Sequence, residues 1–242
     1  MTYELFYWPD IQGRGEFIRL PLEEAGAPYR DVVRESGNGM TEMVEILAGT
    51  AERYPPFAPP FLRDGHIIVS HVANILFYLA PKLQLAPETE ALRVTAHALQ
   101  LTIADLLTEV HNTHHPLSVE LYYEDQMEAA KINAANFLTN RLPKFLGYFE
   151  QLLGKNTEHG LHIIGNRLTY VDLSLFQVVE GLLYAYPRAM FYLDRDYPRL
   201  ARLSDAIRER PRIAHYLASD RRIDFDESGI FRHYSELDQE AS

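Results

Sequence analysis

A phenol and a guanidinium lie close together near the start of the chain, separated by a short loop that contains glycine. Tyr7 belongs to the aromatic run LFYW, and Arg14 stands between two glycines seven positions later. Both groups can stabilise an anion, because the phenol donates a hydrogen bond and the guanidinium adds its charge. Residues 5–20 contain no Ser, Thr or Cys, so Tyr7 is the only hydroxyl there. The alternative is a structural Tyr7 in a core or interface, since buried tyrosines are common.

The composition limits the chemistry that this pair can serve. The 242 residues include no cysteine, which excludes disulfides, thiolate metal sites and a cysteine nucleophile. A thiol must therefore come from a ligand. The formal net charge of −11, with no run of Lys or Arg, argues against nucleic acid as a partner.

The N-terminal stretch MTYELFYWPD carries Glu4 and Asp10 within a short apolar run and has no basic leader before it. Neither a signal peptide nor a membrane span fits this pattern. We therefore expect a cytoplasmic protein with no membrane partner.

The elements around Tyr7 form a mixed α/β segment of about 80 residues. Aromatic and β-branched runs bounded by Pro, Asp or Gly predict strands, whereas helical spacing of apolar residues predicts helices. The order is strand, helix, strand, irregular helix, hairpin and helix, with the clearest elements at 3–8, 14–25, 29–34, 61–69 and 70–79.

The rest of the chain shows only helical patterns. Prolines in APKLQLAPETEA mark a linker, and long amphipathic runs follow it. We predict a first domain at 1–80, a linker at 81–89 and an all-α domain at 90–242. The expected helices of the second domain span about 89–113, 122–153, 170–186, 198–210 and 211–219.

These motifs, taken in order, resemble the soluble glutathione transferases of the tyrosine type, with a bacterial or fungal affinity. LFYW…GRGEFIRLPLEEAG is similar to the family's first strand, loop and helix, although its loop is one residue longer. PFLRDGHIIVSHVANILFYL resembles the cis-proline, hairpin and glutathione-binding helix. The resemblance implies a thioredoxin-like N-terminal domain followed by an all-helical C-terminal domain.

A third motif, GNRLTYVDLSLFQ, resembles the capping box of the family's helical domain. Thr169 is expected as the N-cap residue, paired with Asp172 three positions later, and Leu168 is expected to contact Leu173. This role is structural, so we place none of these residues in an active site.

The resemblance implies a homodimeric enzyme that uses glutathione as co-substrate and transfers it to an electrophilic small molecule. Tyr7 and Arg14 take the positions that act on the thiol. The positions expected to bind glutathione are Trp8, Pro59, Pro60, Ser70, His71 and Val72.

Two residues depart from the family's pattern. Pro60 aligns with the cis-proline, and the residue before it should offer both its N–H and its C=O to glutathione, but Pro59 has no N–H. Either one bond is lost, or Pro59 is itself the cis residue and the strand is shifted by one. Val72 stands where a serine normally holds the γ-glutamyl carboxylate. These departures leave open a protein that keeps the fold and binds a ligand or regulates a partner without catalysis.

Three histidines, His111, His114 and His115, lie within five residues, just before Pro116. Two of them are four positions apart and could share a helix face to bind a metal. No HExxH pattern is present, and Pro116 should end the helix where a rigid site would be needed, so we predict no metal and keep a metalloenzyme built on these histidines as the least favoured alternative. His111, His115 and Tyr122 are instead expected to line the electrophile pocket, with a structural role for the histidines as the equal alternative.

Overall fold

The aromatic run at the N-terminus forms the first strand of a four-stranded mixed sheet. The computed structural model describes residues 2–49, 52–156 and 161–238. The strand order is β2-β1-β3-β4, with β1 parallel to β2 and antiparallel to β3, and β3 antiparallel to β4. The strands are β1 (Tyr3–Phe6), β2 (Tyr29–Asp31), β3 (Phe61–Asp64) and β4 (Ile67–Ser70).

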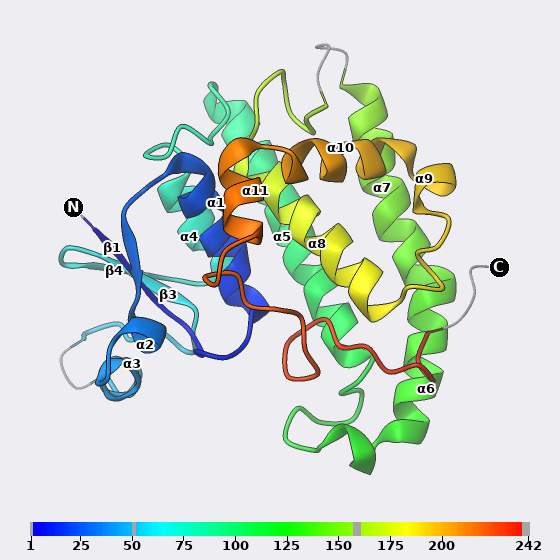
Figure 1. The fold of residues 1–242 in the computed structure, drawn as a ribbon, viewed down its shortest axis with the longest axis horizontal. Helices are drawn as coiled ribbons and strands as arrows, with labels where there is room; N and C mark the ends of the chain where they lie inside the picture. Colours follow the sequence, from blue (N-terminus) through cyan, green and yellow to red (C-terminus); the bar gives the residue numbers. More distant parts are fainter. Residues whose placement is uncertain (1, 50–51, 157–160, 239–242) are drawn as a thin grey trace.

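Neighbouring residues of a strand point to opposite faces of the sheet. Helices cover both of these faces. Leu5 and Leu62 belong to the main core with α1 (Glu16–Ala25) and α4 (Val72–Leu79). Phe6 and Phe61 stack at 4.7 Å on the other face, in a small core with residues of α2 (Val32–Glu35) and α3 (Gly39–Leu47). In Figure 1, α1 and α4 lie between the sheet and the helical part of the chain.

Two predicted strands are longer than the observed ones. The first was expected to reach residue 8 but ends at Phe6, and the second ends at Asp31 instead of 34. In the second, residues 32–35 form a helical turn, and the Ser36 amide donates to the Val32 carbonyl at 3.0 Å. The hairpin and the helices of the first 80 residues are confirmed.

The remaining described chain has no strand. Helix α5 (Glu90–Asn112) contacts both α4 and α8 (Tyr170–Ala185), so it joins the two parts of the molecule. The other helices are α6 (Met127–Asn136), α7 (Leu142–Lys155), α9 (Leu193–Asp196), α10 (Pro198–Arg208) and α11 (Pro211–Leu217), with short turns η1 (Gly13–Gly15), η2 (Tyr123–Asp125) and η3 (Phe137–Arg141).

The predicted helix at 122–153 is divided. A π-helical stretch, η3, separates α6 from α7, and Pro143 is the second residue of α7. A proline has no N–H to continue a helical ladder, which is consistent with a change of winding just before it. The short α9 was not predicted.

The capping box at α8 is confirmed. Thr169 is the N-cap residue, and its amide and its hydroxyl both donate to the Asp172 carboxylate, at 2.7 and 2.8 Å. Asp172 also accepts from the Ile163 amide at 2.8 Å, so the box ties the preceding loop to the helix.

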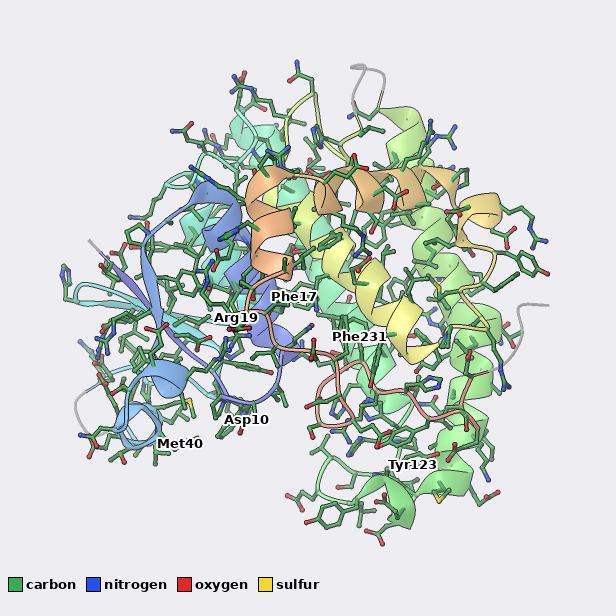
Figure 2. All side chains as sticks on the ribbon, in the orientation of Figure 1. Asp10, Phe17, Arg19, Met40, Tyr123 and Phe231 are labelled. Atoms are coloured by element: carbon green, nitrogen blue, oxygen red, sulfur yellow. The ribbon has the colours of Figure 1, made fainter. Side chains whose placement is uncertain are left out.

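A tail without helix or strand, residues 220–238, crosses the helical part after α11 (Figure 1). Phe231 is buried against α8, where a Cβ at Gly181 would overlap its ring; Figure 2 labels this phenylalanine. Tyr234 stacks on Tyr123 at 3.8 Å. The tail is therefore part of the core.

The fold class predicted from the sequence is confirmed: a small mixed sheet with its helices comes first and a helical part follows. The division at residues 81–89 stays a prediction. Among the described residues, every helix is too short or too polar to cross a membrane.

Candidate active site

Tyr7 lies directly after β1 and is buried under the turn that carries Arg14. Its side chain is 5% exposed, and its hydroxyl oxygen accepts a hydrogen bond from the Arg14 backbone amide at 2.9 Å. A Cβ at Gly13 or Gly15 would overlap the tyrosine ring, and Gly13 has a φ of +43°. The two glycines are therefore needed because the turn η1 passes close over Tyr7.

The burial of Tyr7 determines how its hydroxyl can act. Removal from water raises the pKa of Tyr7, against the smaller lowering effects of the Arg14 amide and of two arginine charges. The phenol is therefore neutral at pH 7. Because its oxygen already accepts the Arg14 N–H, its own proton is free to be donated to an anion.

A buried ionic network holds this turn in place. Arg19 is fully buried on α1 and binds Asp31 at 2.7 Å, Glu16 at 3.3 Å and the Gln12 carbonyl at 3.3 Å. Burial alone would lower the pKa of Arg19, but the Glu16 and Asp31 carboxylates raise it above its usual value. Figure 2 shows Arg19 between the sheet and the helical part.

Glu16 extends the network to the C-terminal part of the chain. It accepts hydrogen bonds from the Tyr216 hydroxyl at 2.8 Å and from Arg222. Gln177 of α8 donates to the Gln12 side chain at 2.8 Å. The sequence interpretation missed this network, although two charged residues on the core-facing side of a helix are a signal for it.

A cleft of about 400 Å³ opens beside the turn. It brings together six of the residues predicted to act on glutathione: Arg14, Pro59, Pro60, Ser70, His71 and Val72. Its opposite wall comes from α5, through Gln100, Ala104, Asp105, Leu107 and Thr108. Tyr7 is not among the lining residues, and its hydroxyl is joined to the cleft through the Arg14 amide.

The backbone along the cleft is open to a ligand. The peptide bond between Pro59 and Pro60 is cis, so Pro60 is the cis-proline and the shifted strand is excluded. His71 precedes α4 with a φ of +70°, an uncommon conformation for a residue with a side chain. No side chain caps α4, so its first amides point to the cleft end of the helix without a side-chain partner.

Gln100 was not anticipated as a site residue. It is 1% exposed, and neither atom of its amide has a partner among the described residues. A glutamine on the apolar side of the 89–113 pattern is the signal that could have found it. Because buried amides are normally paired, Gln100 is a candidate for a ligand contact.

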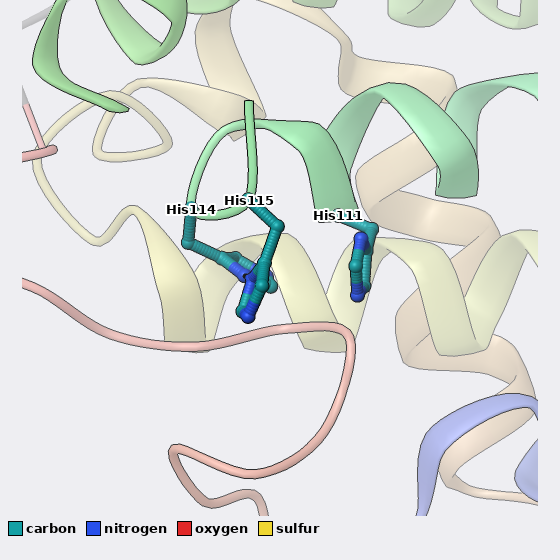
Figure 3. Close-up of side chains that lie close together, drawn as sticks. All are labelled: His111, His114 and His115. Carbon is teal, nitrogen blue, oxygen red and sulfur yellow. Dashed lines mark hydrogen bonds between the residues drawn. The ribbon is translucent and has the colours of Figure 1, made fainter. Parts of the chain in front are cut away.

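Besides Tyr7, four predicted site residues lie outside the lining of this cleft: Trp8, His111, His115 and Tyr122. Trp8 is 42% exposed and follows Tyr7, whereas Tyr122 is 78% exposed and precedes η2. The two predicted histidines, His111 and His115, gather with His114 where α5 ends (Figure 3). Burial lowers the pKa of His111 to about 4 and that of His114 to about 3, and it also lowers that of His115.

The comparisons with known proteins agree with this arrangement. Residues 111–220 match the family model described as glutathione S-transferase, C-terminal domain. A glutathione S-transferase of Plasmodium falciparum is 28% identical over 220 residues, which cover 89% of this chain and 95% of that protein. Glutathione S-transferase P 1 of Xenopus laevis is 23% identical and covers 91% of this chain and 93% of its own length.

Two solved structures share the fold. A Pi-class glutathione S-transferase of Onchocerca volvulus superposes with a TM-score of 0.69 at 23% identity, over 90% of this chain and 92% of that one. A glutathione S-transferase of the hookworm Necator americanus, described as monomeric, gives 0.68 at 17% identity, over 93% and 100%.

A two-part fold of this kind, with a cis-proline beside an uncapped helix, defines the thioredoxin-like proteins that carry a helical C-terminal domain. The family model matches the C-terminal part of the chain, and the similarity to glutathione S-transferases extends over about 90% of its length through the relatives and the shared fold. The bacterial or fungal affinity stays a prediction.

Proposed function

We propose that the protein is a glutathione transferase that activates the glutathione thiol for attack on an electrophilic small molecule. The observation that carries the proposal is the cleft, which joins Arg14 to the cis-proline and to the start of α4. Arg14 in turn holds the Tyr7 hydroxyl through its amide. The cis-proline and the start of α4 can thus hold a peptide, and Arg14 with Tyr7 can stabilise its thiolate.

Activating the thiol requires only that the site stabilise the thiolate modestly relative to the neutral thiol. A free thiol has a pKa near 8.5, and lowering it by about 2 units requires roughly 2.7 kcal/mol. A hydrogen bond from the Tyr7 hydroxyl and the charge of Arg14 supply such a preference in a partly buried site. Within the described residues, the Arg14 guanidinium has no carboxylate partner, so its charge is available to a ligand.

The peptide side binds glutathione through its backbone. The Pro59 carbonyl accepts the one hydrogen bond that this proline can make with the cysteinyl backbone. The amides at the start of α4, with Ser70 and His71, hold the γ-glutamyl carboxylate. Trp8 contributes at the exposed edge.

The electrophile binds toward the end of α5. His111 lies three residues after Thr108, which lines the cleft, so both share one face of the helix. The charge of Arg14 contributes to lowering the pKa of His111, which is consistent with a short separation between them. His115 and Tyr122 complete this pocket.

The active form is a cytoplasmic homodimer. Phe57 is fully exposed at the cleft, and Phe77 of α4 and Leu101 of α5 are each 45% exposed. Large exposed apolar side chains support a subunit interface. Light scattering at micromolar concentration tests the dimer, and Phe57→Ser is expected to weaken it. Nucleic acids and membranes are not partners in this proposal.

Retention on immobilised glutathione, followed by a conjugation assay with an activated aryl halide, tests the activity. We expect retention and turnover in the wild type, and a loss of about a hundredfold in kcat/KM with unchanged retention in Tyr7→Phe. Retention without turnover would instead identify a binding protein that keeps the fold. A wild type that is not retained and does not conjugate would exclude the proposal.

A further inference from the structure

Three imidazoles meet where α5 ends, outside the cleft-lining set. One ring nitrogen each from His111, His114 and His115 lies within 4.8 Å of the others. His111 stacks on His115 with ring centres 4.9 Å apart, and it packs edge-on against His114 at 5.0 Å. Figure 3 shows the three rings pointing to the same side, toward the C-terminal tail.

The tail fixes which nitrogen of His114 is free. Its Nε2 lies 2.9 Å from the Ile230 carbonyl, and since a carbonyl only accepts, Nε2 carries the proton. A neutral ring then has a lone pair at Nδ1, which faces the Nδ1 of His115 at 2.6 Å. A histidine that donates one nitrogen to a carbonyl and offers the other is the usual arrangement of a metal ligand.

The surroundings keep the cluster rigid. His114 is 1% exposed and packs edge-on against Tyr234 of the tail. Between it and α5, the Thr113 hydroxyl bonds to the Val110 carbonyl at 2.7 Å and to the Tyr186 hydroxyl at 2.5 Å. The sequence argued against a metal because Pro116 left the rings without fixed geometry, but the tail and Tyr186 provide that geometry.

We propose that His111, His114 and His115 together bind one divalent transition-metal ion of the zinc class. Ligand nitrogens about 2.0–2.1 Å from a tetrahedral ion lie about 3.3 Å from one another. Side-chain rotations that move the nitrogens by about 1 Å therefore complete the site. The cluster contains no carboxylate, which selects zinc, cobalt, nickel or copper over magnesium and calcium.

Binding requires no redox step. The proton that His115 Nδ1 shares with His114 moves to Nε2 of the same ring, and both Nδ1 lone pairs become ligands. The positive charges of Arg14 and Arg232 act on these rings, so they favour an anion in the fourth position.

Because His111 and His115 are also residues of the proposed electrophile pocket, metal binding is tested without glutathione and is read apart from the transferase activity. The full chain is freed of metal with a chelator and titrated with Co²⁺, whose visible absorption is strong only in sites of low coordination number. We expect saturation at one equivalent and displacement by Zn²⁺. The imidazole nitrogen resonances of the three histidines should shift with Zn²⁺ in the wild type.

His111→Gln is the principal variant, since the His111 ring has no hydrogen bond to the described residues and its loss should leave the fold intact. It is expected to weaken Co²⁺ binding by at least roughly tenfold. His97→Gln is the matched control, because His97 lies on the same helix and packs on Phe77 with centres 4.9 Å apart, and it should bind as the wild type does. A wild type without the absorption band, or equal binding in His111→Gln, would overturn the proposal.

Discussion

The turn that passes over Tyr7 is held by buried side chains from three parts of the chain, whereas the cleft residues just before α4 are not held in this way. Arg19, Glu16 and Gln177 bind the turn and the helix behind it. On the other side, the side chains of Ser70 and His71 have no hydrogen-bond partner among the described residues.

This difference indicates how each region contributes to the site: the turn over Tyr7 acts on the thiol, and the cleft residues from Pro59 to Val72 bind the peptide. Stabilising a thiolate requires donors that are already oriented, because reorientation on binding would use up the gain. Holding a peptide requires backbone groups that no other part of the protein satisfies. We infer that the thiol side is preorganised and that the peptide side is completed by its ligand.

The largest expected effect comes from breaking the network behind the turn. Arg19→Met leaves the buried Asp31 carboxylate without its 2.7 Å partner and removes one of the partners of Glu16, so the free energy of unfolding should fall by about 3–5 kcal/mol. Urea denaturation measures this change. Arg30→Met removes a half-exposed pair with Glu4 and should cost less than about 1 kcal/mol. Equal effects of both changes would contradict a special role for the buried network.

Stability at alkaline pH provides a second test, because it reports whether the buried Tyr7 hydroxyl keeps its proton in the folded state. Because burial raises the pKa of Tyr7, the folded state keeps a proton that the unfolded state loses above pH 10. Stability should therefore fall as pH rises beyond 10, by up to about 1.4 kcal/mol per pH unit for each such tyrosine. Tyr7→Phe should make this fall less steep. An identical slope in both proteins, measured by denaturation at several pH values, would mean that Tyr7 ionises in the folded state.

The smallest expected effect is a gain on the peptide side. Pro59→Val restores the missing N–H and keeps the extended conformation that favours a following proline. One added hydrogen bond of about 1 kcal/mol should tighten glutathione binding by about fivefold, as measured by calorimetry. Pro55→Val, at an exposed position outside the cleft, should change nothing. Unchanged binding in Pro59→Val would show that glutathione does not use this backbone position.

The order of the helices and strands could be predicted from the sequence. So could the cleft residues from Pro59 to Val72 and the pair of Tyr7 and Arg14. Hydrophobic spacing and turn residues place the strands and helices, and the motif from Pro59 to Val72 stays together because it is continuous in the chain. Tyr7 and Arg14 are likewise joined by one local turn.

Contacts between distant segments could not be predicted. The tail has no periodic pattern, so nothing in it indicated that Phe231 would pack on Gly181 or that the Ile230 carbonyl would orient His114. The partners of Glu16 lie about 200 residues away, at Tyr216 and Arg222. Such pairs depend on the docking of the two parts of the chain, which local patterns do not describe.

The pKa of the thiol of bound glutathione tests the central claim most directly. It is measured from the ultraviolet absorption of the thiolate as the pH of the complex is raised, in the wild type and in Tyr7→Phe. We predict a pKa about 2 units below that of free glutathione in the wild type and a value close to that of the free thiol in the variant. The same thiol pKa in both proteins would contradict the role given to Tyr7.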